Sequence, residues 1–392
     1  MYPRNLQTPL RELARYYPVV TVTGPRQSGK TTLCRGTFPE KAYVSLEPLD
    51  DRLFAQTDPR GFLAEHASGA IIDEIQNVPD LLSYLQAEVD VRPEPGRFIL
   101  TGSQHFGLSQ AITQSLAGRT GVLHLLPLSL DELRRFPIPP VGLFETLRSG
   151  GYPRIHDQGI PPERWLADYV TTYVERDVRQ VLNVGDLQAF TTFLKLCAGR
   201  TAQTINLSSL GGDAGVSHNT ARAWISVLET SFICLRLPAW HRNLGKQAVK
   251  AAKLHFVDTG LACHLIGIRS ADQLVHHPQR GAIFESWVVA EIYKARVHRG
   301  LDPGMYHFRD PRGVEVDVVL DTAAQLGLVE VKSSATLASD FFTPLESLAN
   351  QLTRGGEQRR IDRWLVYGGD ATQRRSAGTA VPWSAIPDQD WR

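Results

Sequence analysis

The segment 19–32 constrains the fold of this chain most, because an apolar strand runs directly into a phosphate-binding loop. Residues 19–23 are VVTVT and residues 24–32 are GPRQSGKTT, a G-x-x-x-x-G-K-[ST] pattern that opens a helix. Glycines let backbone N–H groups turn toward an anion, the lysine reaches the β- and γ-phosphates, and the following hydroxyl binds Mg²⁺. The sequence therefore predicts a site for a nucleoside triphosphate, ATP with Mg²⁺, formed by Gly24, Pro25, Arg26, Gln27, Ser28, Gly29, Lys30, Thr31 and Thr32.

A second apolar run ends in two acids. Residues 70–74 are AIIDE, which predicts a buried parallel strand with Asp73 at its carboxyl end. Asp73 is expected to help Thr31 hold Mg²⁺, and Glu74 to act as the base that orients the attacking water. The alternative interpretation is that the pair caps the next helix.

Two further residues are candidates for sensing phosphate. The strand 97–103 ends in hydroxyl groups, and we prefer Thr101 over Ser103 as the residue that senses the γ-phosphate. Those hydroxyls also suit a strand end and a helix cap. Arg119 precedes the strand near Thr120 and is expected to stabilise phosphate charge, in its own chain or in a neighbouring subunit; an ordinary surface arginine is the alternative.

Seven short motifs are spread over the first half of the chain: GPRQSGKTT (24–32), DEIQNVP (73–79), LTGS (100–103), LAGR (116–119), PLS (127–129), GGYP (150–153) and YVERD (173–177). With these motifs the chain resembles bacterial and archaeal ATP-binding proteins that join an AAA-type ATPase domain to a C-terminal domain of unknown function 4143. That resemblance implies an ATPase fold and ATP binding, with five parallel strands in the order 2-3-4-1-5 and the ligand at their carboxyl ends.

Composition narrows the class of protein. With 392 residues, 42% of them hydrophobic, the chain is long enough for two or three domains. Its net charge of +1 argues against coating nucleic acid by bulk charge. Its four cysteines are far apart and are expected to be reduced core thiols, and no apolar run is long enough to cross a bilayer. A soluble, cytoplasmic protein with no membrane partner is therefore expected.

A helical region should follow the ATPase sheet. Residues 165–200 show helical periodicity, and residues 205–230 predict a helix-turn-helix with Ser217 as the N-cap and Val227 and Leu228 inward. Segments 233–237 and 253–257 would be wing strands. If this winged helix binds DNA, the contacting residues at the start of its second helix are His218, Asn219 and Arg222; the alternative is a module that packs against protein.

The last third of the sequence contains a second set of candidate catalytic and metal-binding residues. Asp317 lies on one predicted strand, and Glu330 and Lys332 share a face of the next strand. With Glu285 on the preceding helix, this pattern resembles the signature of PD-(D/E)-x-K nucleases. The resemblance implies that Asp317, Glu330 and Glu285 hold Mg²⁺ against a phosphodiester while Lys332 positions water. The alternative is a silent nuclease-like domain with a structural ion-pair cluster.

Taken together, the sequence predicts an α/β protein of three modules. These are a P-loop ATPase domain (1–140), a helical domain with a winged helix-turn-helix (141–265) and a restriction-endonuclease-like α/β domain (266–392). Residues 373–379 are expected to form a polar loop. The function we favour is ATP hydrolysis coupled to cleavage of DNA or RNA. The alternatives are an ATP-dependent switch that binds DNA, a protein partner or further copies of itself, and a small-molecule kinase.

Overall fold

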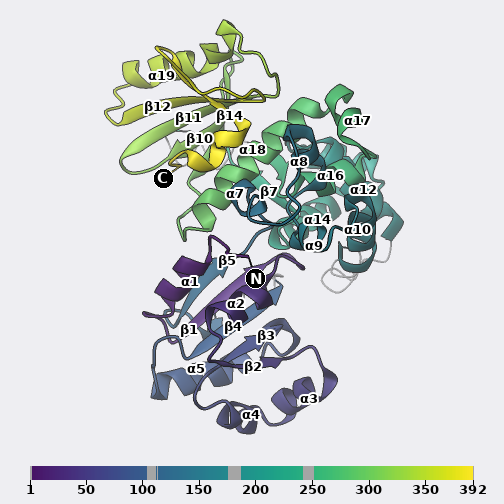
Figure 1. Cartoon of the computed structure of the whole chain (residues 1–392), viewed down its shortest axis with the longest axis vertical. Coiled ribbons are helices and arrows are strands. Elements are labelled where there is room, and N and C mark those ends of the chain that lie inside the picture. The colour runs from purple at the N-terminus through teal and green to yellow at the C-terminus, as the bar shows by residue number, and fades with distance from the viewer. Residues whose placement is uncertain (1, 104–111, 113, 175–186, 242–250, 392) are drawn as a thin grey trace. The chain divides into compact units, whose positions relative to one another are not determined.

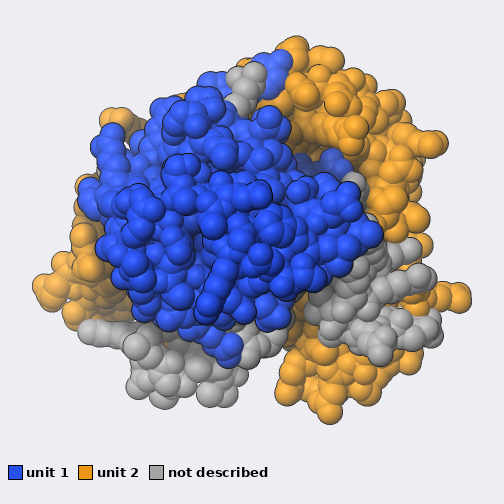
Figure 2. Space-filling view, turned by 90° about the horizontal axis from the view of Figure 1, so that it is seen from below, with its two compact units in different colours: residues 1–128, 230–232, 297–301 blue, residues 129–229, 233–296, 302–392 orange. Residues whose placement is uncertain are grey.

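The computed structural model describes residues 2–103, 112, 114–174, 187–241 and 251–391 (Figure 1). These residues form two compact units. Unit 1 comprises residues 1–128, 230–232 and 297–301, and unit 2 comprises residues 129–229, 233–296 and 302–392 (Figure 2, blue and orange). The last three residues of the predicted YVERD motif lie outside the described residues.

Unit 1 is built on a parallel sheet. Within the described part of the chain its order is β2-β3-β4-β1-β5, so the predicted order 2-3-4-1-5 is confirmed. Each strand is a short run of mainly apolar or β-branched residues, as expected for strands that helices cover on both faces. The strands are β1 (Val19–Gly24), β2 (Ala42–Ser45), β3 (Ala70–Asp73), β4 (Phe98–Ser103) and β5 (Thr120–His124).

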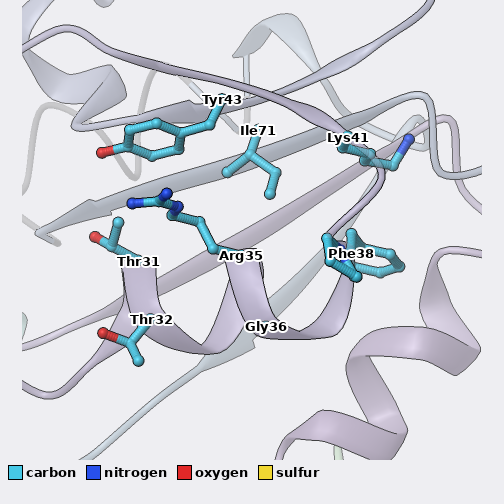
Figure 3. A pocket seen from close by; sticks show the side chains of 9 residues that line it. Thr31, Thr32, Arg35, Gly36, Phe38, Lys41, Tyr43 and Ile71 are labelled. Atoms are coloured by element: carbon cyan, nitrogen blue, oxygen red, sulfur yellow. The ribbon is translucent and has the colours of Figure 1, made fainter. Parts of the chain in front are cut away.

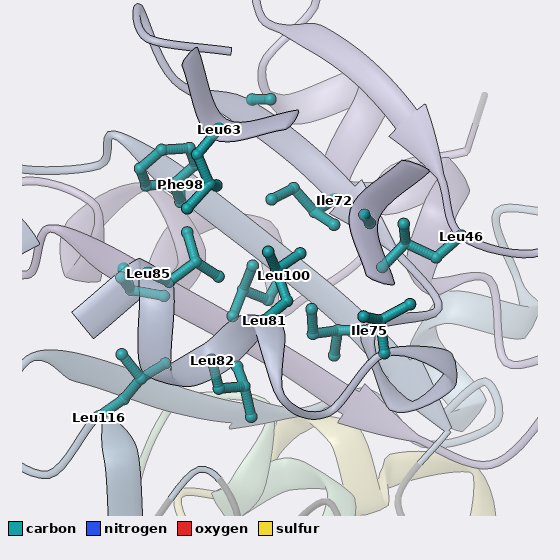
Figure 4. Close-up of a cluster of buried hydrophobic side chains, with 14 of the residues drawn as sticks. Leu46, Leu63, Ile72, Ile75, Leu81, Leu82, Leu85, Phe98, Leu100 and Leu116 are labelled. Carbon is teal, nitrogen blue, oxygen red and sulfur yellow. The ribbon is translucent and has the colours of Figure 1, made fainter. Parts of the chain in front are cut away.

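Alternation along the strands gives the sheet two apolar faces. Ile72 and Leu100 pack on one face against α3 (Leu49–Thr57), α4 (Pro59–Glu65) and α5 (Leu81–Val91) (Figure 4). Ile71 and Ile99, one residue earlier on each strand, pack on the other face against α1 (Gln7–Leu13) and α2 (Lys30–Thr37). With helices packed on both of its faces, the sheet holds the carboxyl ends of β1, β3 and β4 next to one another.

Unit 2 begins with helices. The helix-turn-helix predicted from the sequence is present as α13 (Leu207–Asp213) and α14 (His218–Thr230), and Ser217 Oγ accepts the N–H of Thr220 at 3.1 Å as the expected N-cap. Three antiparallel strands in the order β6-β8-β7 accompany it. The remaining elements here are α7 (Leu130–Leu133), α8 (Leu143–Ser149), α9 (Pro153–Gln158), α10 (Pro162–Tyr169), η2 (Val170–Val174), α12 (Leu187–Gly199), β6 (Gln203–Thr204), β7 (Cys234–Leu237), β8 (Lys253–Phe256), α16 (Thr259–Leu265) and α17 (Ala271–His276).

The rest of unit 2 is a mixed sheet. In the part of the chain that the structure describes, its order is β13-β14-β12-β11-β10-β9, with β9, β10 and β11 antiparallel and β11 parallel to β12. The connection from β11 to β12 carries α19, which covers one face of the sheet (Figure 1). The elements are α18 (Arg280–Val297), β9 (Met305–Arg309), β10 (Glu315–Asp321), β11 (Gln325–Lys332), η3 (Ser339–Phe342), α19 (Thr343–Arg354), β12 (Arg360–Tyr367), β13 (Gln373–Arg375), β14 (Gly378–Pro382) and η4 (Trp383–Asp388).

The expectation of a polar loop at 373–379 is wrong. Residues 373–375 and 378–382 form the β13–β14 hairpin, in which Arg374 pairs with Thr379. The residues of β13 are exposed, so no apolar alternation marks this edge strand in the sequence.

Candidate functional site

The loop between β1 and α2 has the backbone conformation of an anion nest. Gly24, Gln27 and Gly29 all have positive φ, at 154°, 62° and 94°. A side chain at position 24 would collide with the Leu125 carbonyl, so only glycine fits there. Arg4 holds the loop from outside by donating from Nη1 to the Ser28 carbonyl and from Nη2 to the Leu126 carbonyl, both at 2.8 Å. The loop is therefore preorganised by residues that the motif alone does not contain.

Lys30 lies inside this loop. Its side chain is buried, and Nζ donates to the carbonyls of Gly24 at 3.2 Å and Pro25 at 2.8 Å. Burial lowers the pKa of the Lys30 ammonium, while the nearby Glu74 and Asp73 oppose that effect. The ammonium therefore lies on the inner side of the curved loop, where a phosphate-binding lysine is expected.

Three hydroxyl groups converge on Asp73 at the carboxyl end of β3. Thr31 Oγ1 donates to both carboxylate oxygens at 3.0 Å, Tyr43 Oη donates to Oδ2 at 2.9 Å, and Thr101 Oγ1 donates to Oδ1. The β3–β4 register explains this, because Ile72 pairs with Leu100 and the next residue on each strand is Asp73 and Thr101. Two of the predicted site residues, Thr31 and Thr101, therefore donate hydrogen bonds to Asp73, the carboxylate that the sequence predicts to bind metal.

Glu74 has a strained backbone beside this carboxylate. Its φ of 58° is in the left-handed region, which costs a non-glycine residue about 1 kcal/mol. Gln76 Nε2 donates to its Oε2. Glu74 therefore follows Asp73 in a turn at the end of β3, and its carboxylate is hydrogen-bonded to the Gln76 amide.

A pocket of about 460 Å³ opens next to Thr31. Of the nine described residues that line it, two are cationic and none is acidic. The Arg35 guanidinium stacks over the Tyr43 ring at 4.6 Å, close to Thr31 (Figure 3). The lining residues are Thr31, Thr32, Arg35, Gly36, Phe38, Pro39, Lys41, Tyr43 and Ile71.

The expectation that Arg119 contacts phosphate in its own chain is wrong. The Val19 N–H donates to the Arg119 carbonyl, so this residue lies at the amino ends of the strands. The P-loop follows the opposite end of β1, roughly 20 Å away along six residues. The Arg119 guanidinium instead pairs with Asp90 on α5, with Nη2 2.9 Å from Oδ2. A role in a neighbouring subunit stays a prediction.

The residues predicted to contact DNA are exposed. His218, Asn219 and Arg222 all lie on the first two turns of α14, and the inward positions Val227 and Leu228 are buried. The geometry is compatible with either interpretation of the winged helix, contact with DNA or with protein.

The acids of the C-terminal sheet are brought together. Asp317 Oδ2 accepts the N–H of Val331 at 2.9 Å, which ties β10 to β11. Glu330 pairs with Lys332 at 2.5 Å on the shared face of β11, as predicted. Within the described ranges, however, no three side chains of metal-ligand type are placed to hold a metal ion as they stand.

A lysine that the sequence interpretation missed lies among these acids. Lys253 Nζ, from β8, lies 2.9 Å from Glu285 Oε1, 2.6 Å from Glu315 Oε1 and 3.4 Å from Asp317 Oδ1. Lys253 is 4% exposed. A charged residue in a short apolar strand, between Ala252 and Leu254, was the signal that could have found it. We name Lys253, Glu285, Glu315 and Asp317, with Glu330 and Lys332 beside them, the acid cluster.

Burial and charge perturb the acid cluster. Burial, reinforced by Asp317, raises the pKa of Glu285 and of Glu330 to about 8 each. Burial opposes the charge of Lys253, but the surrounding carboxylates outweigh it and raise its pKa. Burial and repulsion from Asp317 therefore favour the protonated form of Glu285 and Glu330, while the neighbouring carboxyl groups keep Lys253 charged.

Three family models match successive parts of the chain. Residues 16–134 match the family model of an AAA domain, residues 142–272 match a domain of unknown function 8612, and residues 280–386 match the domain of unknown function 4143. The chain therefore carries a P-loop ATPase domain of the AAA type followed by a domain of unknown function 4143, and this confirms the resemblance drawn from the sequence. The nuclease-like fold of the latter domain stays a prediction.

Similar proteins include two of mycobacteria. Uncharacterized protein Rv2008c of Mycobacterium tuberculosis and Uncharacterized protein Mb2031c of Mycobacterium bovis are each 28% identical to this chain over 339 residues, which are 85% of this chain and 74% of theirs. Among solved structures, the Walker-type ATPase PABY2304 of Pyrococcus abyssi is 17% identical, with 68% of this chain and 96% of that chain covered and a TM-score of 0.45. RuvB of Thermotoga maritima is 20% identical, with 60% and 90% covered and a TM-score of 0.32.

None of the helices that the structure describes combines the length and the apolar character needed to span a membrane.

Proposed function

We propose that this protein hydrolyses ATP at the carboxyl edge of the unit 1 sheet. The convergence of Thr31 and Thr101 on Asp73, next to the loop that encloses Lys30, is the observation that carries the proposal. Lys30 would bind the β- and γ-phosphates, and Thr101 would hold Asp73 in place or sense the γ-phosphate. Glu74 would accept the proton of the attacking water.

The residues around Asp73 fit Mg²⁺. A hydroxyl and a carboxylate are hard oxygen donors, and Asp73 is buried with its oxygens directed at Thr31. When bound, Mg²⁺ supplies neutralisation of phosphate charge. The remaining work belongs to this chain: the loop N–H groups orient the phosphates, and Glu74 orients water.

The test compares Glu74→Gln with the wild type in ATP binding and in phosphate release. Glu74→Gln should bind ATP with near-wild-type affinity. It should release phosphate at least about 100-fold more slowly than the wild type, since a positioned base contributes about that much to the rate. Lys30→Ala should lose binding or turnover. Glu65→Gln, an exposed glutamate on α4, is the matched control and should behave as wild type. Turnover by Glu74→Gln at the wild-type rate would show that Glu74 is not the base.

A second candidate function concerns the C-terminal domain, for which we propose metal-dependent cleavage of DNA or RNA. It is supported by the order α18-β9-β10-β11-α19-β12 and by the approach of Glu285, Asp317 and Glu330 to one another. These three would hold Mg²⁺, and Lys332 would position water. The alternative, a silent domain in an ATP-dependent switch with a DNA or protein partner, is favoured by the resident ammonium of Lys253.

A cleavage assay separates the two. Single- and double-stranded DNA and RNA are incubated with Mg²⁺ or Mn²⁺, with and without ATP, and wild type is compared with Asp317→Ala and Lys332→Ala. Cleavage lost in both variants supports the nuclease. Absence of cleavage on every substrate, with intact ATP turnover, supports the switch.

We propose that the chain has three modules, at 1–140, 141–265 and 266–392. The family matches at 16–134, 142–272 and 280–386 support these boundaries. Limited proteolysis should cut near 140 and 265 and leave protected fragments.

A further inference from the structure

A pocket of small-molecule size borders the ATP site on its metal side. Thr31 forms part of the pocket wall, and its hydroxyl also donates to Asp73, the carboxylate expected to hold Mg²⁺. The volume of about 460 Å³ is within the range of about 300–1,000 Å³ that is usual for small-molecule sites. The pocket therefore has room for a ligand beside the site proposed for ATP.

The pocket forms where α2 meets the edge of the unit 1 sheet. In the described sheet β2 is an edge strand, and its Tyr43 pairs with Ile71 of β3, so both side chains are on the face that α2 covers. Ile71 is buried there, whereas Tyr43 is exposed. Arg35 follows Thr31 by four residues on α2, which places both on one face of that helix. The helix, the edge strand and the loop between them thus enclose the pocket (Figure 3).

Arg35 supplies a guanidinium at the Thr31 end of the pocket. This guanidinium lies 4.6 Å from the centre of the Tyr43 ring and close to Thr31 (Figure 3). Tyr43 Oη in turn donates to Asp73, so the ring and the guanidinium lie beside the predicted metal-binding carboxylate. Within the described ranges no acid pairs with Arg35. A planar guanidinium without a carboxylate partner is suited to a bidentate contact with a phosphate.

Lys41 supplies a second cation, in the loop between α2 and β2. It is half-buried, its Nζ donates to the Arg97 carbonyl at 3.4 Å, and no carboxylate in the described part of the chain is within ion-pair distance of it. Burial lowers the pKa of this ammonium, although Glu40 opposes that effect. An anion in the pocket would stabilise the charge of Lys41. The wall also contains apolar side chains suited to an organic body, Phe38, Pro39 and Ile71.

We propose that this pocket binds a phosphate group, with the Arg35 guanidinium and the Lys41 ammonium as its charged contacts. The phosphate comes either from the ATP cleaved beside it, as inorganic phosphate, or from a phosphomonoester that binds as a second ligand. The first source rests on the proposed ATP hydrolysis. The second source does not, because both cations lie outside the phosphate-binding loop.

Binding of two probes to the full chain separates these sources. Inorganic phosphate and phenyl phosphate are titrated by calorimetry into protein saturated with Mg²⁺ and β,γ-methylene-ATP, a non-hydrolysable analogue that fills the phosphate-binding loop. Both probes should bind. Tighter binding of phenyl phosphate, through burial of its ring against the apolar wall, assigns the pocket to a phosphomonoester. Binding that is no tighter assigns it to the released phosphate, and binding of neither probe would overturn the proposal.

Variants without the charges assign the binding to this pocket. Arg35→Gln and Lys41→Gln should each weaken phosphate binding about tenfold or more, because a charge-assisted hydrogen bond is lost. Arg60→Gln is the matched control, since this exposed arginine is on α4, which covers the other face of the sheet, and it should bind as wild type does. Wild-type binding by Arg35→Gln or Lys41→Gln, or an equal loss in Arg60→Gln, would contradict the proposal. Arg35 and Lys41 are outside the buried core, so the variants should stay folded, which thermal unfolding checks.

A nucleotide-free comparison distinguishes failure of the pocket from failure of the ATP site. The phosphate-binding loop itself attracts phosphate, and Lys30→Ala removes its lysine. Phosphate binding that persists in Lys30→Ala and is lost when Arg35→Gln is added supports the pocket even if the protein hydrolyses no ATP. Loss of all phosphate binding in Lys30→Ala alone would assign the anion to the loop and overturn the proposal.

Discussion

Replacement of Asp258 should destabilise unit 2 through two identifiable hydrogen bonds. Its carboxylate is buried; Oδ2 accepts the N–H of Gly151 at 2.7 Å, and Oδ1 accepts the N–H of Leu261 at 2.9 Å as the N-cap of α16. Gly150 has a φ of 68°, and a Cβ there would collide with this carboxylate. Gly150, the first glycine of the GGYP motif, thus lets the chain approach Asp258.

The size of the effect follows from these contacts. Loss of an N-cap costs about 1 kcal/mol, and leaving the buried Gly151 N–H unsatisfied costs about 1–3 kcal/mol. Asp258→Ala should therefore lower the free energy of unfolding by about 2–4 kcal/mol. Asp258→Ser keeps a capping oxygen for Leu261 but does not reach Gly151, so it should recover about 1 kcal/mol of that loss.

Urea denaturation followed by tryptophan fluorescence measures this cleanly. All seven tryptophans lie in unit 2, so the signal reports that unit alone. The slope of the unfolding free energy with urea should stay constant across the variants. If Asp258→Ala loses less than about 0.5 kcal/mol, a value typical of surface substitutions, the carboxylate is not what holds this turn.

Three further predictions concern unit 1. Burial lowers the pKa of His124 to about 4. Because the unfolded state then binds the proton at a higher pH than the folded state does, unit 1 should lose stability as the pH falls from about 6.5 to 4. Histidine NMR titration, with a His124→Gln control, checks this. Thr101→Val should slow ATP turnover about 10–100-fold through loss of one hydrogen bond to a charged acceptor, whereas Thr101→Ser should retain most activity; equal rates would contradict the contact with Asp73. Arg119→Ala and Asp90→Ala, which break the same ion pair, should leave ATP binding by a monomer unchanged, and weaker binding to Arg119→Ala alone would contradict its placement at the far edge of the sheet.

Local pattern was sufficient to predict which residues meet at the carboxyl edge of the unit 1 sheet, because these residues follow strand ends in sequence. The strands β1, β3 and β4 are contiguous apolar runs, and parallel strands bring their carboxyl ends to one edge, so Lys30, Asp73 and Thr101 could be predicted together. The same rule, applied to Arg119, would have placed it at the opposite edge, since that residue precedes its strand. Arg4 and Tyr43 could not be predicted, because nothing in their local sequence specifies the loop or the carboxylate that they contact.

The acid cluster marks the limit of this reasoning more sharply. The spacing of Glu330 and Lys332 and the strand that carries Asp317 predicted that Asp317 and Glu330 lie near each other, because each relation is local to a strand or to a strand pair. The presence of Glu315 beside Lys253 was not predicted. The partner of those acids is 32 residues from Glu285 and 64 from Asp317, on a strand assigned to another module. A pattern that counts ligands predicts a metal site. Whether such a site is open depends on which side chains from the rest of the chain reach it. Here that side chain is Lys253 of β8, which a local pattern treats as an ordinary strand residue.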